Sequence, residues 1–380
     1  MRTAMGDKIG VNYGRLSSRP MPHTQAIEKI RSLGANAIKL FDSDRGTLDA
    51  LVNSGLRVTV AIPNGELAEY ANSRRACDEY AAMLRSYLNR NVLIDTVAVG
   101  NEATASWHGG RYSALLMPVF LGLRAAFEAV GVADRIKLTT PFDMSILEVS
   151  YPPSAGRLRP DCEGVVKDVL YFLRNNGGSF MINVYPPITL HENPSIETPF
   201  ATGERGAGGY DDAGRRYDNL FDAQIDAVYA AIERVGYATD DFVIGEVGWA
   251  TAGGHCFHRR NAEAFLRSFL ERRRRGTPRI RKPIPAFLFA FIDEDMKDTG
   301  TPACEHPYMV KHPNVRFALI ALCLIAFPRE AEAPPLLFNH PSSWELPPSL
   351  MPDGTGRCLA ETLPLPPELC LVTDVLMSIA

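Results

Sequence analysis

Short β-prone runs alternate with stretches of helical periodicity from Ile9 to about Asp295, and this alternation limits the fold more than any other feature of the chain. Most of the runs are almost continuously apolar, as expected for parallel strands that are covered on both faces. The eight runs are Ile9–Tyr13, Ala37–Phe41, Arg57–Ile62, Thr96–Gly100, Ile136–Thr140, Ser179–Tyr185, Asp241–Gly245 and Ala286–Phe291.

Seven stretches between these runs have the apolar spacing of amphipathic helices. They are Thr24–Leu33, Thr47–Asn53, Leu67–Leu88, Ser113–Val130, Val165–Leu173, Phe221–Val235 and Asn261–Leu270. Eight strands and seven helices over about 285 residues predict an α/β fold, the (β/α)₈ or TIM barrel. A doubly wound open sheet stays an alternative, because a strand count does not show closure. The turn after the first strand, however, lacks the GxGxxG pattern of the dinucleotide-binding form of that fold.

The barrel domain is expected to cover residues 9–305. Within it, Pro186–Tyr217 is a long insertion after the sixth strand, rich in proline, glycine and charge, and such insertions build substrate clefts at the C-terminal face of a barrel. In residues 306–327, the apolar stretch Asn314–Phe327 can supply a barrel-closing helix. Residues 328–380 are dense in proline and show no period, which predicts a poorly ordered tail.

Composition excludes several function classes. The formal net charge is −4, whereas a general nucleic-acid binder needs a strong basic excess. Seven scattered cysteines with no CxxC predict neither a disulfide framework nor a zinc site, and His255-Cys256-Phe257-His258 matches no standard metal-site spacing, so no metal is expected. The longest apolar run, Phe317–Phe327, is too short to span a bilayer, and no apolar stretch that would mark a signal peptide precedes Ile9.

Two glutamates follow strands that would face each other across an eight-stranded ring. Glu102 ends the run Val97-Ala-Val-Gly-Asn-Glu102, and Glu246 lies in Val243-Ile-Gly-Glu-Val-Gly-Trp249. A pair of carboxyl groups flanking a cleft is what glycosidic hydrolysis needs, one to protonate the leaving oxygen and one to attack or stabilise the anomeric carbon. The alternative is that one glutamate forms a structural ion pair and the other is exposed to solvent.

Nine motifs, in order along the chain, resemble those of the plant glucan endo-1,3-β-glucosidases of glycoside hydrolase family 17. The resemblance covers about residues 9 to 300, nearly four-fifths of the chain. The motifs are Ile9-Gly-Val-Asn-Tyr-Gly-Arg15, Lys39-Leu-Phe-Asp42, Val60-Ala-Ile-Pro-Asn64, Val99-Gly-Asn-Glu102, Ser150-Tyr-Pro-Pro-Ser154, Asn183-Val-Tyr-Pro186, Asn219-Leu-Phe-Asp222, Gly245-Glu-Val-Gly-Trp249 and Phe289-Ala-Phe-Ile-Asp-Glu294.

The resemblance implies a retaining hydrolase that acts within β-1,3-glucan chains without a metal or other cofactor. By motif, Glu102 is the expected general acid/base and Glu246 the expected nucleophile. Glu246 must be ionised to attack, while Glu102 needs a raised pKa to hold its proton, and the proximity of the two charges supplies part of that rise.

The resemblance also indicates residues that bind substrate. Asn101 is similar to the family's contact with a sugar 2-hydroxyl, and Tyr185 to a tyrosine beside the nucleophile. Glu294 and Lys297 resemble an acidic–basic pair near the cleft, with a surface salt bridge as the alternative. Three aromatic rings are candidates either for stacking on sugar faces or for the core: Tyr13, Trp249 and Phe291.

The chain departs from the family at both ends. Relatives usually begin with a secretion signal, which implies an extracellular or cell-wall location, and they continue after the eighth strand into a final helix. Here the similarity ends at Pro302-Ala-Cys-Glu305, and we hypothesise a shifted reading frame or retained intron after this point and a missing N-terminal exon.

The expected partner is β-1,3-glucan, and the chain is expected to act as a monomer with neither a nucleic-acid partner nor a membrane span. Two other functions stay open. One is a β-glucan-binding protein that has lost turnover through its altered C-terminus. The other is a retaining barrel glycosidase that acts on β-1,4-linked glucan or mannan.

Overall fold

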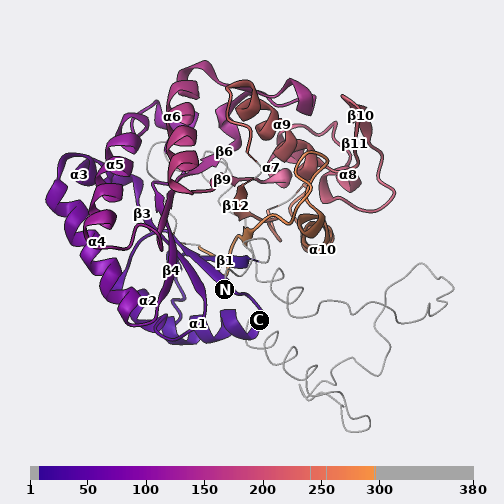
Figure 1. The fold of residues 1–380 in the computed structure, drawn as a ribbon. Helices are drawn as coiled ribbons and strands as arrows, with labels where there is room; N and C mark the ends of the chain where they lie inside the picture. Colours follow the sequence, from indigo (N-terminus) through magenta and orange to yellow (C-terminus); the bar gives the residue numbers. More distant parts are fainter. Residues whose placement is uncertain (1–7, 240, 254, 295, 297–380) are drawn as a thin grey trace, which may run out of the picture. The chain divides into compact units, whose positions relative to one another are not determined.

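A computed structural model describes residues 8–239, 241–253, 255–294 and 296. Four of the expectations above concern residues outside these ranges: the domain boundary at 305, the closing helix in 306–327, the tail 328–380 and the substrate contact Lys297. The fold is described here for the part that carries the barrel (Figure 1).

The centre of the fold is a parallel sheet that closes on itself. In the sheet order β5-β4-β3-β2-β1-β13-β12-β9-β6, the first strand lies beside the last, with Ile9 opposite Ala286. The two ends of this order, β5 and β6, are separated in the chain only by Thr140, so they are two halves of one bent strand. Its first half pairs with β4 and its second half with β9, which closes an eight-stranded ring. The predicted (β/α)₈ barrel is therefore confirmed, and the open sheet was the wrong alternative.

The strands lie close to the predicted runs. Their bounds are β1 (Ile9–Tyr13), β2 (Ala37–Leu40), β3 (Arg57–Ile62), β4 (Leu93–Val99), β5 (Lys137–Thr139), β6 (Pro141–Asp143), β9 (Phe180–Asn183), β12 (Phe242–Val247) and β13 (Ala286–Leu288). The largest difference is at β4, which begins at Leu93 where the sequence predicted Thr96. Asp95 reads as a strand breaker in the sequence, but Lys8 and Arg57 neutralise it in the structure.

Helices pack along the outside of the ring, from the one after β1 to the one after β12 (Figure 1). Their bounds are α1 (His23–Ser32), α2 (Arg45–Ala50), α3 (Leu67–Asn72), α4 (Arg74–Asn89), α5 (Ser113–Ala129), α6 (Pro160–Asn176), α9 (Leu220–Arg234) and α10 (Arg259–Arg275). The single helix predicted for 67–88 is two helices, because the Ser73 hydroxyl accepts a hydrogen bond from Ala76 N at 3.1 Å and starts a new helix. The helix predicted from Val165 begins earlier, at Pro160, whose fixed φ suits a first helical position.

Short elements extend the C-terminal face of the ring. The insertion after β9 forms α7 (Pro186–Glu192), α8 (Thr198–Thr202) and a hairpin of β10 (Tyr210–Asp212) with β11 (Arg215–Tyr217). A second hairpin, of β7 (Leu147–Val149) with β8 (Arg157–Leu158), follows the bent strand. Within the described ranges, single 3₁₀ turns occur at Asn64–Glu66, Ser106–His108, Met144–Ile146 and Pro153–Ala155. Among the residues that the structure describes, no helix is both long and apolar enough to cross a membrane.

Candidate active site

A cleft of about 1260 Å³ lies at the C-terminal face of the barrel. Its floor includes Glu102, Asp143 and Asn183 from the ends of barrel strands, and one wall comes from the insertion, including α7 and Tyr210. The insertion thus builds a cleft, as its composition predicted.

Glu246 lies in β12 and is 1% exposed. Its Oε1 is 3.1 Å from the ammonium nitrogen of Lys39 on β2, and its Oε2 accepts a 2.7 Å hydrogen bond from the Tyr185 hydroxyl. Lys39, itself buried, also donates to Asn12 Oδ1 at 3.1 Å and lies 4.1 Å from the centre of the Phe41 ring. A cation and a hydroxyl donor both favour the charged form of a carboxyl group. These contacts therefore favour the carboxylate form of Glu246.

Glu102 follows β4 in a tight turn. Its φ of +54° is in the left-handed region, and its backbone N–H donates to Pro141 O at 2.8 Å. The side chain of Asn64 clamps the preceding residue, Asn101, because it accepts from Asn101 N at 2.9 Å and donates to Asn101 O at 2.7 Å. The turn directs the Glu102 side chain inward, where it is 3% exposed.

The surroundings of Glu102 favour its protonated form. Burial raises the pKa of the Glu102 carboxyl well above its usual range, and the negative charges of Asp143 and Glu246 raise it further. One hydrogen bond, from Asn183 Nδ2 to Glu102 Oε1 at 2.8 Å, acts in the opposite direction. The two glutamates therefore have opposite proton preferences.

Asn183 connects the two carboxyl groups. It lies opposite Glu246 in the register of β9 with β12, and its side chain donates to Glu102. Strands β4 and β12, on different sides of the ring, thus bring their glutamates to one place, as the strand count predicted. Of the alternative, the ion pair is present, between Glu246 and Lys39, but the exposed glutamate is not, because Glu102 is buried as well.

Tyr185 and Asn101 lie beside the two glutamates. Burial and the charge of Glu246 raise the pKa of the Tyr185 hydroxyl well above its usual range, so it remains a proton donor. The Asn101 side-chain oxygen lies 3.5 Å from Asn183 Nδ2. Both residues are half-buried.

Glu294 is half-buried and packs closely on the turn after β1. Its Oε1 accepts from Leu16 N at 3.3 Å, and a Cβ atom at Gly14 would come within 1.9 Å of this oxygen. Its charge contributes to the raised pKa of Tyr185, which puts Glu294 near the cleft. The expected partner, Lys297, lies outside the described residues.

The three remaining candidates are in the core. Tyr13, Trp249 and Phe291 are 3%, 2% and 1% exposed. Tyr13 packs edge-on against Phe291 at 5.9 Å, and the Trp249 indole donates to the Cys256 carbonyl at 2.9 Å. Neighbouring side chains cover these rings. Of the two alternatives, stacking on sugar faces or packing in the core, the structure therefore favours the core.

Several residues of the site were missed by the sequence analysis. Lys39 and Asn12 each carried a signal, since each is a polar residue within an otherwise apolar strand. Asn183 and Asp143 stand at strand ends, where functional residues of barrels gather. Three aromatic residues along the cleft had no signal, because they lie on loops and short elements: Trp107, Phe200 and Tyr210. A fourth, Tyr151, lies within one of the nine motifs but was not singled out.

A closed parallel barrel with a cleft at its C-terminal face and two buried carboxyl groups is an arrangement that glycoside hydrolases use. Comparison with known proteins agrees: the model of "Glycosyl hydrolases family 17" matches residues 9–317. The chain belongs to this family and is a glycoside hydrolase.

Two plant relatives and one solved structure illustrate the match. "Glucan endo-1,3-beta-glucosidase 5" of Arabidopsis thaliana is 32% identical over 294 residues, which are 76% of this chain and 61% of that protein. "Glucan endo-1,3-beta-glucosidase, basic vacuolar isoform" of Nicotiana plumbaginifolia is 31% identical over 312 residues, 82% of this chain and 85% of that protein. The structure of CJP38, a β-1,3-glucanase and allergen of Cryptomeria japonica pollen, superimposes with a TM-score of 0.74 at 28% identity, covering 77% of this chain and 92% of that one.

Proposed function

We propose that this chain hydrolyses internal β-1,3-glucosidic bonds of β-glucans with retention of anomeric configuration, using Glu246 as nucleophile and Glu102 as general acid/base. The observation that carries the proposal is the opposite proton bias of two buried carboxyl groups that lie close enough for the charge of Glu246 to raise the pKa of Glu102. Lys39 and Tyr185 stabilise the charge of Glu246, whereas burial and neighbouring charge keep the proton on Glu102. The names of the plant relatives support the β-1,3 linkage.

The reaction would take two displacements. In the first, a Glu246 oxygen bonds to the anomeric carbon while the glycosidic C–O bond breaks, and Glu102 gives its proton to the leaving oxygen. Glu102 is then ionised and takes a proton from water as that water attacks the anomeric carbon. The bond to Glu246 breaks, and the original protonation states return.

Three half-buried residues are proposed to assist. Asn101 would contact the sugar 2-hydroxyl, because it lies one residue before the acid and within the same turn. Tyr185 would hold the Glu246 carboxylate in place through its 2.7 Å hydrogen bond. Glu294 would bind substrate at the rim; its proposed partner, Lys297, rests on the resemblance alone.

Release of reducing sugar from laminarin tests the proposal. We expect the wild type to be active and Glu246→Ala and Glu102→Gln to fall to the background rate. NMR of the first products should show the β-anomer before mutarotation, and an α-anomer formed first would refute retention. Binding of laminarin without sugar release above that of the variants would instead support the glucan-binding alternative. Hydrolysis of carboxymethylcellulose or mannan faster than that of laminarin would instead support a β-1,4-linked substrate.

The remaining expectations stay predictions. They are the domain boundary at 305 with its closing helix and tail, action as a monomer, the absence of a nucleic-acid partner, and an extracellular or cell-wall location.

A further inference from the structure

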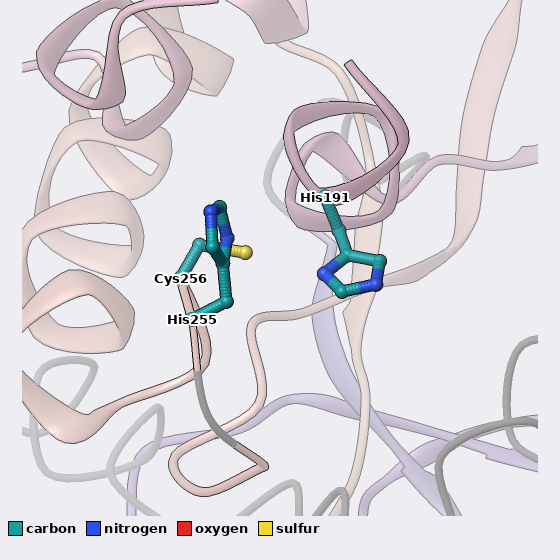
Figure 2. Close-up of side chains that lie close together, drawn as sticks. All are labelled: His191, His255 and Cys256. Atoms are coloured by element: carbon teal, nitrogen blue, oxygen red, sulfur yellow. The ribbon is translucent and has the colours of Figure 1, made fainter. Parts of the chain in front are cut away.

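Two histidines and a cysteine from different parts of the chain meet beside the cleft. His191 lies in α7, within the insertion, whereas His255 and Cys256 lie in the loop between β12 and α10. One ligand atom from each residue, two imidazole nitrogens and the thiol sulfur, lies within 4.8 Å of the other two (Figure 2).

Surrounding contacts fix this cluster. The Cys256 carbonyl accepts hydrogen bonds from the Trp249 indole at 2.9 Å and from Asn261 Nδ2 at 3.0 Å, and its thiol lies 3.7 Å from the carbonyl oxygen of Pro187 in the first turn of α7. The His191 ring packs edge-on against that of His255, with 5.7 Å between the ring centres. The loop and the insertion are therefore already in contact.

We propose that His191, His255 and Cys256 bind one zinc ion, with the fourth coordination position open to water. Imidazole nitrogen and thiolate sulfur are the ligands that zinc prefers, and a site with three protein ligands plus water is one of its common arrangements. Bond lengths of about 2.0–2.3 Å in a tetrahedral site put ligand atoms about 3.3–3.8 Å apart, so the observed cluster needs to contract by about 1 Å. Rotation of exposed His255 can supply this movement.

Solvent can reach the cluster from two sides. His255 and Cys256 line a separate cavity of about 380 Å³, and His191 lines the large cleft. An ion can therefore approach the cluster from either cavity.

Zinc binding would release a proton. An ordinary thiol has a pKa of about 8.5 and is mostly protonated at pH 7. Coordination replaces the S–H bond by an S–Zn bond and passes the proton to the buffer. Affinity should therefore rise with pH.

This site was not expected from the sequence, and the reason is clear. The sequence analysis weighed His255-Cys256-Phe257-His258 as a local motif and found no standard spacing. In the structure, the third residue beside His255 and Cys256 is His191 of the insertion and not His258. His258 instead caps α10 by accepting from Asn261 N at 3.4 Å.

Metal binding to the full chain, without a polyhistidine tag and in reduced, metal-stripped form, tests the proposal. Calorimetry with Zn²⁺ should give one ion per chain, and comparison of two buffers should show about one proton released. Co²⁺ should bind with a thiolate-to-cobalt charge-transfer band in the near ultraviolet. Cys256→Ser should abolish this band, and His191→Gln should weaken Zn²⁺ binding at least about tenfold.

Two matched variants serve as controls. Cys162→Ser removes another buried thiol, and His258→Asn removes the neighbouring imidazole but keeps a good helix cap. Both should bind Zn²⁺ as the wild type does. The proposal is overturned if wild-type Co²⁺ shows no thiolate band, or if binding depends on His258 and not on His191. The wild-type spectrum decides even if a variant fails to fold, and none of these readouts depends on hydrolase activity.

Discussion

Replacing Lys39 by methionine tests whether its ammonium group keeps Glu246 ionised. In the wild type the two groups are 3.1 Å apart and both side chains are 1% exposed. Methionine has a similar length and is apolar, so the variant removes the charge without leaving a large cavity. The Glu246 carboxylate would then be buried without its cation.

The size of the effect follows from this geometry. At 3.1 Å and an effective dielectric constant of about 20, two unit charges attract each other by about 5 kcal/mol, and removing one partner of a buried pair costs about 3–5 kcal/mol. The variant can limit this loss by binding a proton at Glu246. From an ordinary carboxyl pKa of about 4.3, protonation costs about 4 kcal/mol at pH 7 and about 1 kcal/mol at pH 5. We therefore expect the free energy of unfolding to fall by about 3–4 kcal/mol at pH 7 and by about 1 kcal/mol at pH 5.

Activity should respond in the same direction. A protonated Glu246 cannot attack, so the acid limb of the kcat/KM profile on laminarin should move to higher pH in Lys39→Met. Lys8→Met is the matched control: Lys8 is also buried and lies 3.0 Å from a carboxylate, that of Asp95, but both stand near the start of strands, away from the cleft. This control should lose stability and keep the wild-type profile.

Two results would contradict the reasoning. If folded Lys39→Met keeps the wild-type pH profile, Lys39 does not hold the charge of Glu246. If its loss of stability is the same at pH 5 and pH 7, the loss comes from packing and not from the carboxylate. Urea unfolding at both pH values, followed by circular dichroism, measures the second point.

Three further predictions concern buried groups. Folding raises the pKa of Glu102, so the wild type loses stability as pH rises above the ordinary carboxyl pKa of about 4.3. Glu102→Gln should therefore be more stable than the wild type between pH 5 and 8 and equally stable below pH 4. Equal urea midpoints at all pH values would refute this. Tyr185→Phe removes a 2.7 Å bond to a charged acceptor, worth about 1.5–3 kcal/mol, so kcat/KM should fall about 10- to 100-fold without loss of fold, and an unchanged value would exclude the role. Burial raises the pKa of Asp226 to about 6. Its contribution to the free energy of unfolding, about 3 kcal/mol, is therefore present below pH 4 and is lost as pH rises through 6. Asp226→Asn should flatten this part of the pH dependence, measured as the slope of the free energy of unfolding against pH.

The barrel and its two glutamates were predictable because their signals are local. Each strand is a short apolar run, and Glu102 and Glu246 each follow such a run directly. Strand number then places them on different sides of the ring, since strands four and seven are three positions apart in a ring of eight. The role of Lys39 could have been predicted in the same way, because a lysine in the apolar strand Ala37–Leu40 needs a buried anion as its partner.

Other features depend on tertiary contacts that no local pattern contains. The bend at Thr140 became clear only from the pairing of its two halves with different neighbours. Trp249 and Phe291 follow strands just as the glutamates do, yet they turn into the core, because large apolar rings gain more from burial than from the cleft. The meeting of His191 with Cys256 requires the path of the whole insertion.

Because the groups that influence the two glutamates lie on different strands, it should be possible to change the pKa values of the two carboxyl groups separately. Glu246 contacts Lys39 of β2 and the Tyr185 hydroxyl, whereas Glu102 is influenced by burial and then by Asp143 of β6. Asp143→Asn removes one neighbouring negative charge, so the pKa of Glu102 should fall and the basic limb of kcat/KM should move to lower pH, while the acid limb stays in place. Lys39→Met should move the acid limb to higher pH and move the basic limb less, because Lys39 is the smallest of the influences on the pKa of Glu102. The double variant should therefore show both shifts added together and a narrower bell. If either single variant moves both limbs equally, the two carboxyl groups titrate as one unit, and separate roles for their neighbours are refuted.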